Sequence, residues 1–246
     1  MTALDWEGCL NARDLGGLPT AGGDVTRSGS VIRSDNVGGL TERGWRSLAE
    51  HGVVRIVDLR WSEEREGESA PQIDVEVVHV PVLGESIDEE YIAELNASLD
   101  ESSDIADYYS WSYVDFLERF RERFGLAFAA IADADGTVVV HCVGGKDRTG
   151  LVSALLLRLA GVEIAVIGAD YALSEVNLAP RAPSWLDGIE DELERERRRK
   201  LLLTPAEGMT EALRELERRY GSVEEYLRSA GVDDGRIERL RARLAA

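Results

Sequence analysis

Cys142 and Arg148 are the residues whose types and spacing point most directly to chemistry. A thiolate is a strong nucleophile, and the planar guanidinium of arginine can hold two phosphate oxygens at once. Gly144 and Gly145 lie between them and have no Cβ to obstruct a close approach of the backbone to an anion. The stretch 137–150 therefore predicts a loop that binds a phosphate group and carries a nucleophile.

The elements on either side of this loop must position it. Residues 138–140 are apolar and β-branched, which predicts a central parallel strand covered on both faces. Residues 151–160 are apolar on nearly all sides and stop at Gly161, which predicts a buried helix. A strand, a loop and a helix start in this order point backbone N–H groups and the positive end of the helix dipole at one spot. A dianion and a thiolate are both stabilised there.

The whole string His-Cys-x-x-Gly-x-x-Arg-Thr-Gly, placed between an apolar strand and an apolar helix, is a specific pattern. Lys146 is notable because the 28 basic residues of the chain include only two lysines. The loop residues predicted to bind phosphate or substrate are Val143, Gly144, Gly145, Lys146 and Thr149, with His141 in support. The alternative is a buried structural cysteine beside a surface turn.

The same residues resemble the signature His-Cys-x5-Arg-Ser/Thr of the protein tyrosine phosphatase superfamily, and the loop is similar to that of the bacterial protein tyrosine/serine phosphatase family. Other segments resemble this family in the same order, so that the resemblance covers nearly the whole chain. They are residues 11–17, 32–35, 57–60, 169–171 and 220–226. The resemblance implies an α/β fold with a central, mostly parallel sheet flanked by helices. It also implies hydrolysis of phosphate monoesters through a phosphocysteine intermediate, without a metal or another cofactor.

The resemblance implies phosphotyrosine in proteins as the substrate, with activity also on phosphoserine, phosphothreonine and phosphoinositides. Lys146 favours such breadth, because an added cation helps a pocket to take a more highly charged head group. Two alternatives stay open: a phosphate-binding module that has lost turnover, and a rhodanese-like sulfur transferase. A module that only binds does not need Cys142, Lys146 and an acid together, and His141 with the Lys-Asp-Arg-Thr string does not favour sulfur transfer.

The general acid is the point at which the sequence departs from the commonest superfamily pattern. Many tyrosine phosphatases take the leaving-group proton from a Trp-Pro-Asp loop, and this sequence has none. Asp147 lies in the loop beside Arg148 and either donates this proton or only stabilises the loop. Asp58, at the carboxyl end of a predicted strand, is the second candidate. Asp107 and Asp115 also lie at suitable distances along the chain, but in a stretch that is predicted to be helical.

The charge of the chain limits its partners. A net charge of −19 weighs against nucleic acids and anionic membranes. A phosphate pocket in so acidic a chain must gather cations locally. Arg13, Arg33 and Arg60 are the candidates outside the loop, and the resemblance places the segment of Arg13 near the active site. For each of them the alternative is a solvated surface charge.

The length of 246 residues and the 44% hydrophobic content predict one α/β domain. A helix with Thr41 as its N-cap and Gly52 at its end separates two of the predicted strands. The strand candidates other than residues 138–140 are residues 30–33, 53–59 and 75–82.

Two segments of this domain carry further predictions. Residues 1–180 are assigned to the phosphatase domain, with a mobile lid at 85–107 because this acidic stretch links the sheet to a core helix. A capping box at residues 86–89 is expected to open a helix in the lid. Residues 181–246 are assigned to a helical subregion packed on the same domain.

In this subregion, residues 184–203 predict one charged helix with ion pairs four residues apart. The pairs are Asp191–Arg195, Glu194–Arg198 and Glu196–Lys200. The basic run 195–200 is interpreted as a solvated helix face rather than a phosphoinositide site. Thr204 is predicted to cap the next helix, which ends at Gly221. Further helices are expected at 222–231 and 236–245.

Cys9 and Cys142 are too few for a disulfide framework, and Cys9 is predicted to be a free thiol. A regulatory disulfide between them is the alternative. No run of the sequence reaches transmembrane length, and the first residues lack the basic and apolar regions of a signal peptide. We therefore expect a cytoplasmic enzyme, with leaderless secretion left open. Its expected partner is a phosphoprotein or phosphoinositide substrate, without nucleic acid and without stable membrane insertion.

Overall fold

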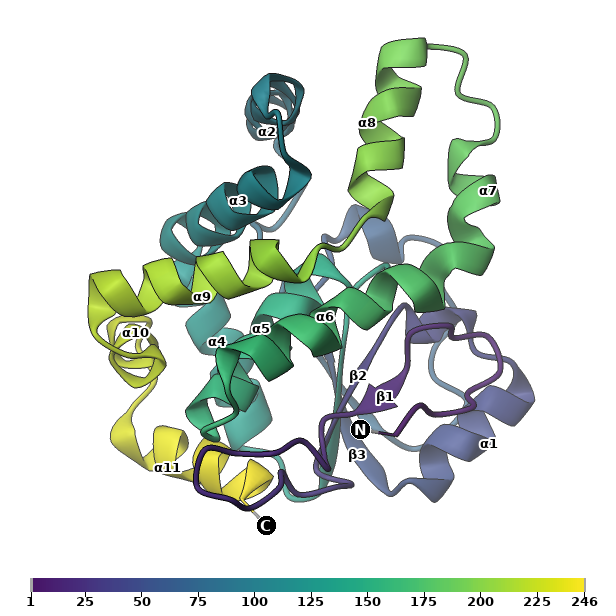
Figure 1. Cartoon of the computed structure of the whole chain (residues 1–246). Helices are drawn as coiled ribbons and strands as arrows, with labels where there is room; N and C mark the ends of the chain where they lie inside the picture. The colour runs from purple at the N-terminus through teal and green to yellow at the C-terminus, as the bar shows by residue number, and fades with distance from the viewer. Residues whose placement is uncertain (1, 246) are drawn as a thin grey trace.

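The structure is a computed structural model that describes residues 2–245. Its centre is a five-stranded sheet in the order β1-β2-β5-β3-β4 (Figure 1). The strands are β1 (Arg13–Asp14), β2 (Val31–Ser34), β3 (Val53–Asp58), β4 (Glu76–His79) and β5 (Thr137–His141). β1 pairs antiparallel with β2 at one edge, and all other neighbours are parallel. The predicted fold class is thus confirmed.

β5 lies in the middle of the sheet and is buried along its whole length. Its side chains alternate between two hydrophobic clusters, one on each face of the sheet. Val139 belongs to the cluster of Ile32 and Ile56, while Val138 and Val140 belong to the other. A strand that is covered on both faces can be apolar at every position. The continuous apolar run 138–140 predicted such a strand for this reason.

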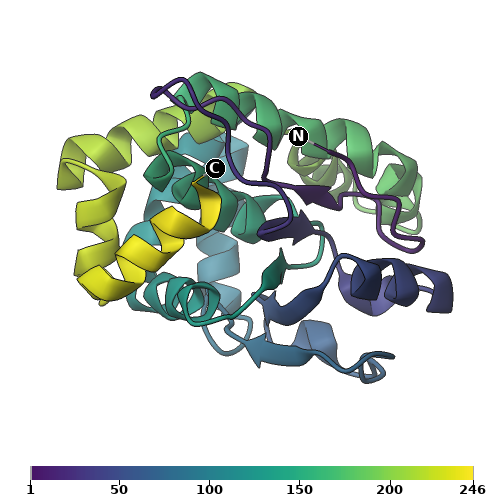
Figure 2. The ribbon, with the colours of Figure 1, turned by 90° about the horizontal axis from the view of Figure 1, so that it is seen from below.

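Helices cover both faces of the sheet (Figure 2). One face carries α1 (Glu42–Glu50), whose Trp45 and Leu48 are buried with Trp6. Thr41 caps this helix as predicted, since its side chain accepts a hydrogen bond of 3.2 Å from the Gly44 N–H. The other face carries α4 (Arg121–Ala132), α5 (Asp147–Leu159) and α6 (Ile164–Leu178).

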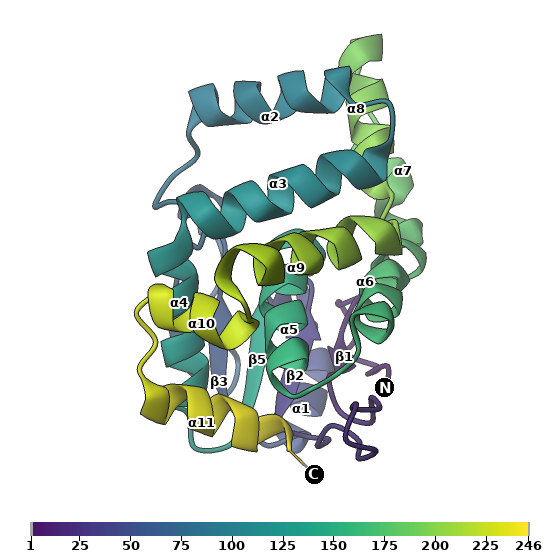
Figure 3. The same ribbon diagram turned by 60° about the vertical axis from the view of Figure 1, so that its left-hand side comes forward.

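The remaining long helices form outer layers. α2 (Glu89–Glu101) lies on α3 (Ile105–Arg119), and α3 packs on α9 (Ala206–Tyr220), as Figure 3 shows. α10 (Val223–Ser229) and α11 (Asp234–Leu244) pack against α5 and α4. No helix among residues 2–245 is both long enough and apolar enough to cross a membrane.

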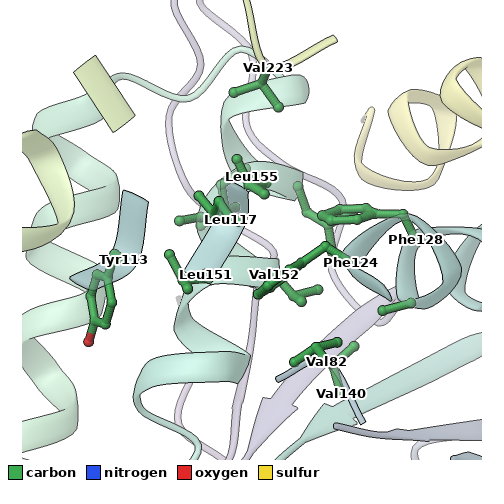
Figure 4. Packing of buried hydrophobic residues seen from close by; sticks show 14 of the residues in the cluster. Val82, Tyr113, Leu117, Phe124, Phe128, Val140, Leu151, Val152, Leu155 and Val223 are labelled. Atoms are coloured by element: carbon green, nitrogen blue, oxygen red, sulfur yellow. The ribbon is translucent and has the colours of Figure 1, made fainter. Parts of the chain in front are cut away.

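Of the helices after residue 181, α9, α10 and α11 share a core with the sheet. Figure 4 shows Val223 in the same cluster as Phe124, Leu155 and Val140. Tyr113 lies at the edge of the cluster with its hydroxyl turned away from the aliphatic side chains (Figure 4). The boundary near residue 180 stays a prediction.

Two predicted caps are wrong. The N-cap of α2 is Asp88 instead of a residue of the expected Ser86 capping box, and the Asp88 carboxylate accepts from the Glu90 and Tyr91 N–H groups at 3.1 Å. Thr204 does not cap α9. Its hydroxyl accepts from the Glu175 N–H at 3.1 Å and donates to a carbonyl of α6, so that it ties two helices together instead.

The predicted helix 184–203 is two helices. α7 (Ala182–Leu186) follows the 3₁₀ turn Ala179–Arg181, and α8 (Glu192–Leu202) begins after Gly188, which has a positive φ of 76°. Asp191 is the N-cap of α8, where its carboxylate accepts from the Glu194 N–H at 2.8 Å. Arg195 donates to the Ile189 carbonyl instead of pairing with Asp191. Of the predicted pairs, the structure forms Glu194–Arg198 at 2.8 Å.

Candidate active site

A cavity of about 510 Å³ opens at the carboxyl end of β5. Its floor is the loop between β5 and α5, and α3, α2 and α8 supply walls. The loop residues that line it are Cys142, Val143, Gly144, Lys146, Asp147 and Arg148. Aromatic walls come from Trp61, Tyr108, Tyr109, Tyr113, Phe116 and Trp185. The structure thus brings the predicted nucleophile, arginine and acid to one place, with Cys142 itself 2% exposed.

Contacts behind the loop fix its backbone. The Asn11 side chain donates to the carbonyl oxygens of Gly144 and Gly145 at 3.0 and 3.2 Å, and Arg33 donates to that of Gly145 at 2.8 Å. These carbonyls are therefore held by side chains that do not line the cavity. Gly145 has a φ of 63°, and a Cβ there would lie 2.4 Å from the Ser34 carbonyl oxygen. Only glycine fits this position.

A buried ion triad stands behind these contacts. Asp170 on α6 binds Arg13 at 2.8 Å and Arg33 at 2.5 Å, and all three side chains are nearly inaccessible. Burial opposes the ionisation of Asp170, but the two guanidinium groups outweigh it and lower the pKa of its carboxyl below the usual value. Arg13 and Arg33 thus brace the loop from behind and do not enter the cavity. Sequence reasoning gave Asp170 no role, although it lies in one of the matching segments.

The triad should contribute much to stability. Asp170→Asn leaves two buried guanidinium groups without their counter-charge, so we expect a loss of about 3–5 kcal/mol in the free energy of unfolding. Urea unfolding at neutral pH measures it. The control is Glu42→Gln, which breaks the exposed Arg46–Glu42 pair and should cost less than about 1 kcal/mol. A loss for Asp170→Asn no larger than this control would contradict the assigned role.

The pH dependence of this contribution has a definite sign. Because the folded-state pKa of Asp170 is lowered, its stabilising effect is present above the ordinary aspartate range, at about pH 4. It is lost as the pH falls through the lower folded value. The wild-type protein should therefore lose more stability between neutral pH and acid than Asp170→Asn does.

Arg148 is held by a residue that the sequence did not reveal. Glu64, in the 3₁₀ turn Glu63–Arg65, binds its two terminal nitrogens at 2.5 and 2.9 Å. Burial opposes the charge of Arg148, but Glu64 and the neighbouring loop groups outweigh it and raise the pKa of the guanidinium. The guanidinium also lies 4.8 Å above the Trp61 ring. Its Nε–H has no hydrogen bond to Glu64, so this side of the fork is left for a phosphate oxygen.

Lys146 is directed at the wall of the cavity. Its Nζ donates to the Tyr109 hydroxyl at 2.7 Å and to the Leu201 carbonyl at 2.5 Å, near the carboxyl end of α8. It also lies 3.4 Å from Asp147. Lys146 therefore ties the loop to α3 and α8.

Asp147 begins α5 and is held through one oxygen. Its Oδ1 accepts a hydrogen bond of 2.6 Å from the Tyr113 hydroxyl. Within residues 2–245 its Oδ2 has no hydrogen-bond partner, and the side chain is 39% exposed. Thr149, two residues further on, is fully buried with an unpaired hydroxyl in the described part of the chain.

Asp58 and Arg60 do not join this cavity. Both line a second cavity of about 510 Å³, together with His141. Asp58 binds Arg60 at 2.8 Å and Arg65 at 3.0 Å, and Arg60 also binds Glu68. Burial opposes ionisation of Asp58, but Arg60 and its neighbours outweigh it and lower the pKa of this carboxyl to about 2. The expected phosphate contact of Arg60 thus finds no support, because its guanidinium is taken up by two carboxylates.

His141 lies between the second cavity and the phosphate loop. Its ring lies 3.7 Å from Asp58, and Nδ1 lies 3.2 Å from the Cys142 carbonyl oxygen. Burial lowers the pKa of this imidazole below its usual value. A neutral ring between the strand end and the loop fits the supporting role expected of it.

The other candidates of the sequence lie elsewhere. Asp107 and Asp115 line a separate cavity with residues of α9, and Asp115 accepts from the Tyr91 hydroxyl at 2.6 Å.

Cys9 and Cys142 are both free thiols. Burial, and next the nearby Asp35, raise the pKa of the Cys9 thiol to about 12. Residues 2–245 contain no group of three or more His, Cys, Asp or Glu side chains placed to hold a metal ion.

The fold and the loop are those expected of a tyrosine phosphatase, and comparison with known proteins gives the family. A profile described as the tyrosine phosphatase family matches residues 4–246, and the chain belongs to this family. The resemblance drawn from the loop and its companion segments is thereby confirmed.

Named relatives agree with this assignment. A protein of Cupriavidus necator that carries the name of a tyrosine-protein phosphatase is 33% identical over 234 residues, which cover 92% of this chain and 83% of that protein. A tyrosine-protein phosphatase of Nostoc commune is 30% identical over 235 residues, covering 87% of this chain and 74% of the relative. The triple specificity protein phosphatase PtpB of Mycobacterium tuberculosis is 26% identical over 275 residues, which cover 98% of both chains.

Proposed function

We propose that this protein hydrolyses phosphotyrosine in proteins through a phosphocysteine intermediate on Cys142. The observation that carries the proposal is that Cys142, Asp147 and Arg148 line a single cavity with aromatic walls. Such walls suit the ring of a phosphotyrosine side chain. A module that only binds phosphate would not need a nucleophile and an acid in the same cavity.

The proposed reaction has two steps. In the first, the Cys142 thiolate attacks phosphorus, the P–O bond to the substrate breaks, and Asp147 gives its proton to the leaving oxygen. In the second, water attacks the phosphocysteine, Asp147 takes a proton from this water, and phosphate leaves. Arg148 and the loop N–H groups stabilise the charge on the phosphoryl oxygens in both steps. Because Arg148 and the loop N–H groups supply this charge stabilisation, we expect the activity to persist in the presence of chelators.

We propose phosphoserine, phosphothreonine and phosphoinositides as secondary substrates. The name of the mycobacterial relative states a triple specificity. Arg197 and Arg198 of α8 line the rim of the cavity, where a second anionic group of a substrate would lie. Both are paired in the structure, Arg197 with Asp100 at 2.5 Å and Arg198 with Glu194 at 2.8 Å. A substrate panel of phosphopeptides and phosphoinositides, assayed with chelator present, ranks these classes.

The segment 85–107 is proposed as a lid. It contains α2, whose Ile92, Leu95 and Asn96 form part of the cavity wall. The Arg197–Asp100 ion pair joins this segment to α8. Substrate entry would therefore require α2 and α8 to part or to move together.

Asp147→Asn tests the general acid. Because a general acid contributes about 10²–10⁴-fold, chiefly for poor leaving groups, the variant should slow phenyl phosphate by that range. It should slow an activated aryl phosphate far less, and the basic limb of its pH profile should flatten. Steady-state kcat on both substrates between about pH 5 and 9 measures this.

Two matched variants accompany this test. Asp115→Asn changes a carboxylate outside the cavity and should show no leaving-group dependence. Asp58→Asn changes the second candidate of the sequence. If Asp58→Asn shows the leaving-group dependence and Asp147→Asn does not, the role belongs to Asp58.

A further inference from the structure

We propose that Tyr113 is a positioning residue for the general acid: it holds Oδ1 of Asp147, so that the proton for the leaving oxygen sits on Oδ2. The inference rests on the function proposed above and adds a residue to it. Tyr113 is one of the aromatic residues that recur at helical spacing from Tyr109 to Phe124. Its hydrogen bond to Asp147 is what sets it apart from the others.

The hydrogen bonds form a short chain. The Tyr113 hydroxyl lies 2.6 Å from Oδ1 of Asp147 and 2.7 Å from the Tyr171 hydroxyl. An ionised carboxylate can only accept, and a phenol has a single proton to donate. Tyr113 therefore donates to Asp147, and Tyr171 must donate to Tyr113. The order of donors runs from α6 through α3 to the loop.

Neither phenol in this chain loses its proton at working pH. Burial, and next the Asp147 carboxylate, raise the pKa of Tyr113 well above its ordinary value. Burial likewise raises the pKa of Tyr171. A proton on Oδ1 would reverse the whole chain and leave the buried Tyr171 O–H without an acceptor among residues 2–245, so Tyr113 remains the donor whether or not Asp147 is ionised.

This fixed donor decides where the acid proton resides. A protonated carboxyl has one O–H and one carbonyl-like oxygen. Since Oδ1 accepts from Tyr113, the proton of Asp147 is placed on Oδ2, which lies free of hydrogen-bond partners among residues 2–245. When the S–P bond forms and the P–O bond breaks, this proton passes to the leaving oxygen, and the resulting carboxylate keeps its donor.

Packing holds Tyr113 in this orientation. Its side chain is fully buried, and its ring meets that of Tyr171 edge-on at 5.9 Å and that of Tyr109 at 5.3 Å. Because the Tyr113 ring is already fixed on two sides, it loses little further conformational freedom when it orients Asp147. The hydroxyl is thus aimed at Asp147 before substrate arrives.

Other charged and titratable groups face Asp147. In the loop they are Cys142, Lys146 and Arg148, of which Lys146 is 3.4 Å away. On α3 they are Tyr108 and Tyr109, and on α8 they are Glu194, Arg197 and Arg198. Of these residues, together with Tyr113 and Tyr171, Tyr113 is the one that donates a hydrogen bond to the Asp147 carboxylate in the structure. The substitution of Tyr113 should therefore remove this hydrogen bond and leave the other groups around Asp147 in place.

The test is Tyr113→Phe, assayed on phenyl phosphate and on an activated aryl phosphate. We expect kcat on phenyl phosphate to fall about 10-fold, because the acid proton is no longer confined to Oδ2. The activated substrate should be nearly unaffected. The ionised carboxylate also loses a donor, so the basic limb of the pH profile should move up by about one unit.

Two further variants keep the test decisive. Tyr91→Phe removes the same kind of bond, from a tyrosine to Asp115 outside the cavity, and should leave the basic limb in place. Tyr171→Phe keeps the bond to Asp147 but removes the donor behind it, so it should shift the limb in the same direction by less. If Tyr113→Phe fails to fold, this smaller shift supports the inference and its absence overturns it.

The outcomes separate the inference from the function on which it rests. Equal slowing of both substrates by Tyr113→Phe, with an unmoved limb, would mean a purely structural role and overturn the inference alone. No slowing of either substrate would also overturn it. An Asp147→Asn protein without leaving-group dependence would overturn both the general-acid assignment and this inference.

Discussion

Replacing Cys142 with serine is expected to lower kcat by at least about 10⁴-fold on every phosphate monoester. The hydroxyl is a far weaker nucleophile than a thiolate, and no second thiol lines the cavity among the residues described. Serine is close in size to the buried cysteine, so the variant should fold and still bind phosphate. Steady-state turnover, and phosphate binding measured by calorimetry, test the two halves of this prediction.

Cys9→Ser is the matched control for this experiment. Cys9 is a half-buried thiol outside the cavity, with a pKa of about 12 that keeps it protonated at neutral pH. Its replacement should leave turnover close to that of the wild-type protein. Substantial turnover by Cys142→Ser, or loss of turnover in Cys9→Ser with an intact fold, would remove Cys142 as the nucleophile.

Arg148→Lys should lower kcat/KM by about 10²–10³-fold, the usual cost of losing an electrostatic contact to the transition state. An ammonium group is a point charge and cannot hold two phosphoryl oxygens in the plane of a fork. It also cannot bind both oxygens of Glu64, the contact that orients the guanidinium in the free enzyme. Because the substitution conserves the positive charge, the loss in kcat/KM measures the contribution of the guanidinium geometry.

The control for this substitution is Arg119→Lys. Arg119 is half-exposed and pairs with Glu94 and Asp115 away from the cavity. The same change of side chain there should alter kcat/KM by less than twofold, about the scatter between repeated assays. Near-normal rates for Arg148→Lys would show that phosphate does not bind this residue.

Much of this arrangement could be predicted because it is local in sequence. One loop holds Cys142, Asp147 and Arg148. The apolar runs on either side of it predict a buried strand and a buried helix. Strand β3 was also predicted, although Arg55 interrupts its apolar run and Val54 is exposed. Parallel strands that are covered on both faces leave a continuous apolar run, which has few other interpretations.

The supporting residues could not be predicted, because tertiary packing alone brings them to the loop. Glu64 meets Arg148 across 84 positions, and Tyr113 meets Asp147 across 34. Periodicity indicates that Tyr113 faces the interior, but it cannot say that a hydroxyl there meets a carboxylate. Asp170 lies in a helix whose pattern is simply apolar, so nothing local announces two buried arginine partners.

The same limit explains the misplaced arginines. Arg60 stands at the carboxyl end of a parallel strand, which is where ligands gather in open α/β sheets. Its side chain instead binds Asp58 and Glu68, two carboxylates whose positions depend on the turn after β3. The spacing of charges along the chain does not specify such pairs.

If the proposed mechanism holds, a phosphoryl group passes through the sulfur of Cys142 during each turnover. The most direct test quenches the enzyme in acid during turnover of an activated aryl phosphate and measures the mass of the peptide that contains Cys142. We expect one added phosphoryl group on this peptide of the wild-type enzyme. The phosphorylated peptide should accumulate in Asp147→Asn, because this variant slows the second step. The same peptide of Cys142→Ser should carry no phosphoryl group. Rapid turnover with no phosphoryl group on Cys142 at any quench time, or with the group on another residue, would contradict the proposed mechanism.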